Sequence, residues 1–140
     1  MIRPLLFALI LAAPALALAN PAAKPADITG AWAFTTQKYG DSCKLSGTVV
    51  VKPAGKSFSC TMAAQEICRD IKVRAKETCA ATRKGDDLII KASVVSVDPD
   101  VGYVPDDFEL KVQSGSYMKG MLRSFHSAPV DFYRGDAPVS

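Results

Sequence analysis

The feature that most limits the fold is a two-residue alternation of apolar and polar side chains, clearest in residues 70–83, DIKVRAKETCAATR. One set of positions there is apolar and the intervening set is basic: Ile71, Val73, Ala75 and Cys79 against Lys72, Arg74 and Lys76. Successive side chains of a β-strand point to opposite faces. The segment therefore predicts a strand with one buried face and one solvated face.

The same pattern recurs along most of the chain, with turn sequences such as PAGK (53–56), KGDD (84–87) and SGS (114–116) in between. Seven further segments read as strands: 31–37, 44–52, 57–64, 88–97, 108–113, 116–125 and 128–134. Helix is expected nowhere except as one turn within 62–70. Eight short strands in succession predict an all-β, antiparallel up-and-down barrel, whose closure removes exposed edges. A two-sheet sandwich is the alternative, because strand count alone does not decide.

The first nineteen residues have the pattern of a secretory signal peptide. Arg3 is followed by an apolar run that ends in Ala17-Leu18-Ala19, a small-residue cleavage site. The run is broken by Pro14 and is shorter than the roughly 20 residues that a membrane span needs. We therefore expect a signal peptide at 1–19, a periplasmic or secreted product, and no membrane span.

The rest of the chain divides into three parts. Residues 20–27, rich in Pro and Ala, predict a flexible arm. A single β-barrel domain is expected over 28–134, followed by a frayed tail at 135–140. Loss of Arg3 lowers the formal net charge from +3 to +2, which gives no reason to expect a nucleic-acid partner.

Four cysteines, Cys43, Cys60, Cys68 and Cys79, lie within the expected domain. An even number in an exported chain predicts two disulfides. Their spacing lacks the short pairs typical of zinc sites, so we expect no metal and no other cofactor.

Hairpin geometry favours one pairing of these cysteines. A turn centred on 53–56 places Cys43 opposite position 66, within reach of Cys68, and a turn near 69–70 places Cys60 opposite Cys79. We favour Cys43–Cys68 and Cys60–Cys79. The alternative pairs Cys60 with Cys68 and Cys43 with Cys79.

The first strand begins Gly30-Ala31-Trp32, and the last ends at Arg134 in VDFYR. A G-x-W start on an eight-stranded barrel resembles the calycin group, lipocalins and their bacterial relatives. The resemblance implies that Trp32 closes one end of the barrel beneath Arg134. It also implies close backbone approach at Gly30.

The same stretch is similar to small periplasmic inhibitors of secreted metalloproteases, which are also G-x-W barrels with a Cys soon afterwards and a second some 25 residues on. Cys43 and Cys68 stand at a comparable distance. This second resemblance implies that the N-terminal arm enters a protease cleft, with a secreted protease as the partner.

Enzymatic signals are sparse, and we expect no enzyme and no catalytic residue. His126 lies in a link with Ser124 and Ser127, and neighbours on a hairpin rarely form a nucleophile and its oriented base. A cluster of acidic residues could offer oxygen ligands to Ca²⁺. It consists of Asp98, Asp100, Asp106 and Asp107. The prolines among them indicate a solvated turn-rich loop instead.

The remaining candidate site is the barrel interior, which in eight-stranded barrels holds side chains or one small ligand. The expected lining consists of Phe34, Val49, Phe58, Val73, Ile90 and Leu110. Small residues such as Gly47 and Gly120 suggest some unfilled space, although they also permit tight packing. The leading hypothesis is a binding protein for a small apolar or amphipathic molecule. A protease inhibitor and a ligand-free structural protein of the envelope are the alternatives.

Overall fold

The structure is a computed structural model that describes residues 24–135. The expected signal peptide at 1–19, the start of the arm and residues 136–140 of the expected tail lie outside this range. In the described part, no helix has the length and apolar character needed to cross a membrane.

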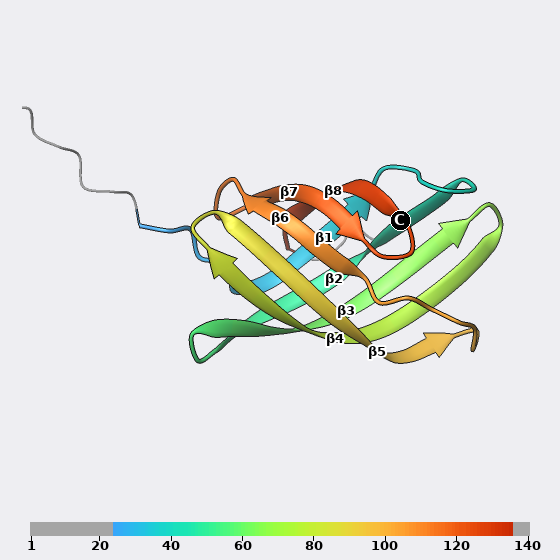
Figure 1. Cartoon of the computed structure of the whole chain (residues 1–140), viewed down its shortest axis with the longest axis horizontal. Coiled ribbons are helices and arrows are strands. Elements are labelled where there is room, and N and C mark those ends of the chain that lie inside the picture. The colour runs from blue at the N-terminus through green and yellow to red at the C-terminus, as the bar shows by residue number, and fades with distance from the viewer. Residues whose placement is uncertain (1–23, 136–140) are drawn as a thin grey trace, which may run out of the picture.

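Eight antiparallel strands form a closed barrel in chain order, with β8 paired to β1 (Figure 1). They are β1 (Gly30–Thr36), β2 (Cys43–Ala54), β3 (Ser57–Cys68), β4 (Ile71–Lys84), β5 (Asp87–Asp98), β6 (Asp107–Val112), β7 (Tyr117–Arg123) and β8 (Ser127–Arg134). The predicted up-and-down barrel is confirmed, and the sandwich is excluded. The helical turn considered within 62–70 is absent, because β3 continues to Cys68 and a two-residue turn follows.

Three two-residue hairpins join β2 through β5. The first turn residue has positive φ in each case: Gly55 at 62°, Arg69 at 55° and Gly85 at 60°. Positive φ at that position is what a type II′ hairpin requires. The first of these turns is Gly55–Lys56, one residue later than the centre of PAGK, so Cys43 lies directly opposite Cys68 rather than opposite position 66.

Both disulfides join residues that face each other across neighbouring strands. Cys43–Cys68 links β2 to β3, and Cys60–Cys79 links β3 to β4. This is the pairing that hairpin geometry favoured. Two disulfides in a barrel of this size are typical of a non-reducing, extracytoplasmic environment.

Apolar side chains fill the centre of the barrel. The rings of Phe34, Phe108 and Phe132 contact one another with centroids 5.1–5.3 Å apart. A Cβ on Gly47 would lie 2.7 Å from the ring of Phe34, and one on Gly120 would lie 1.9 Å from the carbonyl oxygen of Glu109. These glycines therefore allow neighbours to pack closely and do not leave free space.

One end of the barrel, which we call the closed end, is covered by Arg134. Its guanidinium carbon lies 4.1 Å from the centroid of the Trp32 ring. Its nitrogens donate to the carbonyl oxygens of Asp27, Thr29 and Gly115. Trp32 is fully buried, and its indole nitrogen donates to the carbonyl of Ile28 at 2.9 Å. The opposite end, where the β1–β2, β3–β4, β5–β6 and β7–β8 connections lie, we call the open end.

A β-bulge interrupts the pairing of β4 with β5 towards the open end. Lys76 pairs with Ser96 and Glu77 with Val94, so Val95 has no partner on β4. On β5 the bulge moves the inward-facing positions from even to odd residue numbers. Val94, before the bulge, and Val97, after it, are both half-buried, while Val95 and Ser96 are exposed. Such irregularities re-aim side chains locally.

Candidate ligand site at the open end of the barrel

A cavity of about 300 Å³, here the open-end cavity, lies among three connections: residues 37–42, 99–106 and 124–126. The Cys43–Cys68 disulfide forms part of its wall. Its lining is polar and apolar in similar measure, and comprises Tyr39, Cys43, Glu66, Cys68, Gly102, Tyr103, Val104, Asp106, Leu122, Ser124, Phe125 and His126.

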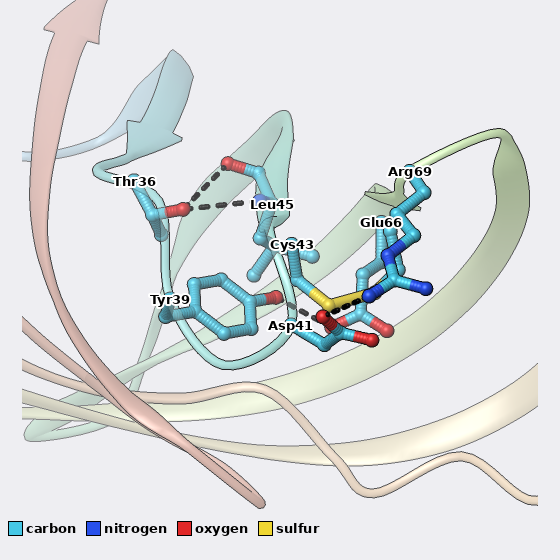
Figure 2. The surroundings of a disulfide bond; sticks show 8 residues. Thr36, Tyr39, Asp41, Cys43, Leu45, Glu66 and Arg69 are labelled. Carbon is cyan, nitrogen blue, oxygen red and sulfur yellow. Dashed lines mark hydrogen bonds and ion pairs between the residues drawn. A yellow bond between two sulfur atoms is a disulfide. The ribbon is translucent and has the colours of Figure 1, made fainter.

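Tyr39 and Glu66 line the cavity. Their side chains lie beside the Cys43–Cys68 disulfide (Figure 2). The backbone of Tyr39 is held by two hydrogen bonds to Cys43, at 2.9 and 2.8 Å. This places the Tyr39 hydroxyl where it donates to Oε2 of Glu66 at 2.5 Å. Burial, and then the hydrogen bond to the Glu66 carboxylate, raise the pKa of Tyr39 far above its usual value, so the phenol stays protonated.

Two buried carboxyls, those of Glu77 and Asp106, lie next to each other: Asp106 lines the cavity, and Glu77 does not. Glu77 is 2% exposed and Asp106 3% exposed. The backbone nitrogen of Asp106 donates to Oε1 of Glu77 at 3.1 Å, and the Tyr103 hydroxyl donates to Oδ2 of Asp106 at 2.7 Å. Apart from the proton that the carboxyls of Glu77 and Asp106 can share, Oε2 of Glu77 has no hydrogen-bond donor among the described residues.

Burial and mutual repulsion govern the charge of this pair. Loss of solvation, followed by the nearby charge of Glu77, raises the pKa of Asp106 to about 8. Loss of solvation is also the main reason that the pKa of Glu77 is raised. Two carboxyls in contact ionise one after the other. At neutral pH the pair therefore retains a proton.

The rim of the cavity is aromatic. Phe125 is 78% exposed, and its ring centroid lies 4.8 Å from that of His126. The ring of His126 is in turn 5.8 Å from that of Tyr39, and a Cβ on Gly40 would touch its Nε2 at 3.0 Å. The lining of the cavity thus combines aromatic rings with the carboxyls of Glu66 and Asp106.

The arrangement does not provide a metal site. Within the described residues one cluster has suitable ligand atoms close together, namely the two sulfurs of Cys43 and Cys68 with Glu66. Those sulfurs are bonded to each other, so neither is a thiolate ligand. The aspartates of the expected acidic loop do not gather as ligands: Asp98 and Asp100 are exposed, while Asp107 binds the backbone of Ala92.

The expected interior lining lies elsewhere. Phe34, Val49, Ile90 and Leu110 belong to the packed core, and Phe58 lies against it. Val73 lies on the inner face of β4 but beyond the core, and it is only half-buried. None of these six residues lines the open-end cavity. Gly30, Trp32 and Arg134 meet at the closed end, where the Gly30 backbone has φ of 104° and lies against the Arg134 guanidinium.

Asp106 corrects one sequence-based interpretation. The sequence indicates a solvated loop there, yet Asp106 is buried, and its backbone nitrogen donates to Oε1 of Glu77 on the inward face of β4. His126 lies in the expected turn and lines the cavity. In the described part of the chain neither serine hydroxyl bonds the His126 ring: that of Ser124 donates to the carbonyl of Val104, and that of Ser127 accepts from Arg123. The backbone nitrogen of Ser124 donates to the carbonyl of His126, as a turn requires.

Glu77 was missed altogether, although the sequence carried a signal for it. In residues 70–83 it occupies an inward position, between Ala75 and Cys79 in the apolar series. A carboxyl on the buried face of an alternating strand is rarely free of function or a partner, because burying it is costly.

The fold and this site define a small disulfide-bonded β-barrel with a cavity of mixed polar and apolar lining at one end. No protein-family model and no curated protein matches the sequence. Two solved structures are similar in fold. A de novo designed fluorescence-activating β-barrel is 17% identical with a TM-score of 0.52, over 76% of this chain and 93% of that one. A redesigned β-barrel is 15% identical with a TM-score of 0.53, over 78% and 92%. At these identities the likeness shows the fold alone.

Proposed function

We propose that the protein is an exported, non-enzymatic, lipocalin-like binding protein that holds a small amphipathic molecule in the open-end cavity. The observation that carries this proposal is the cavity itself: about 300 Å³, with apolar and polar walls, at the end of a barrel whose centre is filled by side chains. Small-molecule sites begin at roughly this size and combine apolar walls with a few placed polar groups.

Three further observations support the proposal. The expected signal peptide and the two disulfides fit a periplasmic or secreted protein. The G-x-W start with Arg134 over Trp32 resembles lipocalins, which are binding proteins. A barrel of similar fold has been designed to activate a fluorophore. The site that we propose lies at the end of the barrel, whereas the sequence-based lining residues belong to the core or lie outside the cavity.

The test is a titration of ¹⁵N-labelled protein with three six-carbon probes, 1-hexanol, hexylamine and hexanoate, followed by NMR. At least one probe should shift the amide signals of Tyr39, Tyr103 and Phe125 in a saturable way. Gly102→Phe should weaken that binding about tenfold or more, because Gly102 lines the cavity and a side chain there meets nothing within 4 Å.

Gly115→Phe is the matched control. Gly115 also has open space around it but lies at the closed end, beside Arg134. Equal loss of binding in both variants, or no saturable shift with any probe, contradicts the proposal. As a separate measurement, native mass spectrometry of protein purified from its own host would show whether a natural ligand is retained.

A second candidate function is inhibition of a secreted protease through the N-terminal arm. The observation that favours it is that Arg83 and Arg134 fix the carbonyls of Ala26 and Asp27 at the closed end. These hydrogen bonds fix the position at which the arm leaves the barrel. Deletion of residues 20–25, which keeps both anchored residues, should abolish inhibition of a secreted metalloprotease. Unchanged inhibition, or none in the full chain, excludes this role.

A further inference from the structure

We propose that the protein docks on membranes that contain anionic phospholipids, through the outer face of β2, β3 and β4, here called the basic face. The inference goes beyond the proposed function and does not depend on a ligand in the open-end cavity. It follows from the division of charge around the barrel, from a groove in this face and from apolar side chains exposed beside the groove.

Positive charge is concentrated on the basic face, although the formal net charge of the whole chain is only +3. The three strands lie side by side in the barrel (Figure 1), and the structure describes all of their residues. None of their outward positions is Asp or Glu, because Glu66 lines the open-end cavity and Glu77 is buried. The outward basic residues are Lys44, Lys52, Lys72, Arg74, Lys76 and Lys84. The face therefore attracts anions.

The opposite side of the barrel is balanced instead. The outer face of β6, β7 and β8 carries basic and acidic residues in equal number: Lys111, Lys119 and Arg123, and Asp107, Glu109 and Asp131. Within residues 24–135, three of the four salt bridges include a residue of β6, and none includes a cation of the basic face. The barrel thus neutralises its charge on one side and leaves it to an external anion on the other.

Four of the six cations gather towards the open end. Ile67 on β3 pairs with Lys44 on one side and with Lys72 on the other. Arg74 and Lys76 follow at alternate positions of β4, which are about 7 Å apart along a strand. Like charges at such distances repel one another. An anionic surface laid against this part of the face removes that cost.

A groove of about 450 Å³, here called the basic groove, crosses the same part of the barrel surface from β3 to β5. It is lined by Ala63, Ala64, Gln65, Arg74, Ala75, Lys76, Ser96, Val97 and Asp98. Two cations, an amide and a hydroxyl thus lie beside small apolar side chains, with one carboxylate at the end of β5. The Arg74 guanidinium is held there by a hydrogen bond from its Nε to Oε1 of Gln65 at 3.4 Å. Cations beside an apolar lining suit a lipid phosphate and the carbon atoms next to it.

Large apolar side chains are exposed next to the basic groove. Val95, at the β-bulge, is 65% exposed and immediately precedes Ser96, the partner of Lys76. Ile71, which immediately precedes Lys72, is 67% exposed. A hydrated polyanion gains nothing from these side chains, whereas the interface of a bilayer accepts apolar groups together with Lys and Arg. The face therefore fits an anionic bilayer better than a soluble polyanion.

The test is sedimentation of the exported form, expected to begin at residue 20, with vesicles at about 0.1 M NaCl, where charges more than about 10 Å apart are largely screened. Phosphatidylcholine vesicles with about one-third phosphatidylglycerol should bind the protein, and pure phosphatidylcholine should not. Lys72→Gln, Arg74→Gln and Lys76→Gln together should weaken that binding about 100-fold, since each cation near an anionic surface contributes a factor of about five.

The matched control changes Lys111, Lys119 and Arg123 to Gln together. It lowers the net charge by the same amount on the balanced side of the barrel, and it should bind within about threefold of the native protein. The NMR spectrum of each variant reports whether it is folded. An equal loss of binding in both triple variants overturns the inference, because net charge and not the basic face would then govern binding. Failure of the native protein to bind phosphatidylglycerol vesicles overturns it as well.

Val95→Ser tests the apolar contribution. It should weaken vesicle binding about threefold or more, whereas Ile89→Ser, at an exposed position of β5 outside the basic groove, should not. Poly-L-glutamate represents a soluble acidic partner. If it displaces the vesicles at a carboxylate concentration below that of the phosphatidylglycerol, a soluble partner is preferred and the inference is overturned. The titration with six-carbon probes is a separate measurement, so the proposed function can stand when this inference fails.

Discussion

The guanidinium of Arg134 lies over the indole of Trp32, with its central carbon 4.1 Å from the ring centroid, and the two residues are direct partners across the β1–β8 seam. The same side chain donates to the carbonyls of Asp27, Thr29 and Gly115. One arginine thus connects the segment before β1, the β6–β7 turn and the last strand. The segment before β1 and the end of β8 are the two parts of that end that no connection between strands holds together.

Arg134→Ala should lower the free energy of unfolding by about 2 kcal/mol, through loss of the cation–π contact and of charged hydrogen bonds. Arg134→Lys should lose roughly half of that, because an ammonium lacks the planar fork that reaches three carbonyls. Urea unfolding followed by Trp32 fluorescence measures both. Arg123→Ala is the control: Arg123 forms an exposed pair with Glu109, and its loss should cost about 0.5 kcal/mol or less. An equal loss of the free energy of unfolding in Arg134→Ala and Arg123→Ala would contradict the role of Arg134 in closing this end of the barrel.

Most of this closed end could be predicted from the sequence, because it depends on local rules. Alternation gave the inward face of each strand, Gly and turn residues gave the hairpins, and these together bring Cys60 opposite Cys79. The Trp32–Arg134 contact was implied by the resemblance to lipocalins, and barrel closure permits it because the first and last strands become neighbours. The β2–β3 turn is Gly55–Lys56, one residue later than the sequence predicted. Pairing partners predicted by counting from a turn are wrong by two positions when the assumed turn centre is wrong by one.

The two disulfides should contribute similarly to stability and differently to binding. They close loops with sequence separations of 25 and 19 residues, for which chain entropy predicts roughly 3 kcal/mol each. Cys43→Ala with Cys68→Ala should also weaken probe binding, because that bridge lines the cavity. Cys60→Ala with Cys79→Ala serves as the control and should leave binding unchanged. Urea unfolding measures the loss of stability, and the NMR titration measures the loss of binding. If the Cys60/Cys79 variant lost binding and the Cys43/Cys68 variant kept it, the probes would bind elsewhere than in the open-end cavity.

Gly47 should not tolerate a side chain. A Cβ there would lie 2.2 Å from the carbonyl oxygen of Ala63 and 2.7 Å from the Phe34 ring, so either the backbone or the packed ring must move. Gly47→Ala should destabilise the protein by about 1–3 kcal/mol, as overpacking does. Gly102→Ala, with nothing within 4 Å, should leave the free energy of unfolding unchanged or raise it by up to about 1 kcal/mol. A neutral Gly47→Ala would show that the interior has spare room.

The open-end site was less accessible to sequence reasoning, for two physical reasons. The burial of Asp106 depends on how residues 99–106 cross the barrel mouth, and loop paths are not encoded by a two-residue period. The bulge at Val95 also breaks the alternation within β5, which reads in the sequence as uninterrupted. Glu77 is the residue of this region that the sequence could have revealed, because a carboxyl interrupts the apolar series on the inward face of β4.

The buried carboxyl pair should make stability depend on pH in an unusual direction. Asp106 has a pKa of about 8 when folded and about 3.9 when unfolded, so between these values the unfolded state binds fewer protons. The free energy of unfolding should then fall as pH rises from 4 to 8, by at most about 1.4 kcal/mol per pH unit from this group. Asp106→Asn removes this group's contribution and should gain stability relative to the native protein as pH increases from 5 to 8. Urea unfolding at each pH measures the difference, and Asp100→Asn should follow the native curve. Parallel curves for native protein and Asp106→Asn would mean that the folded protein holds Asp106 ionised at neutral pH.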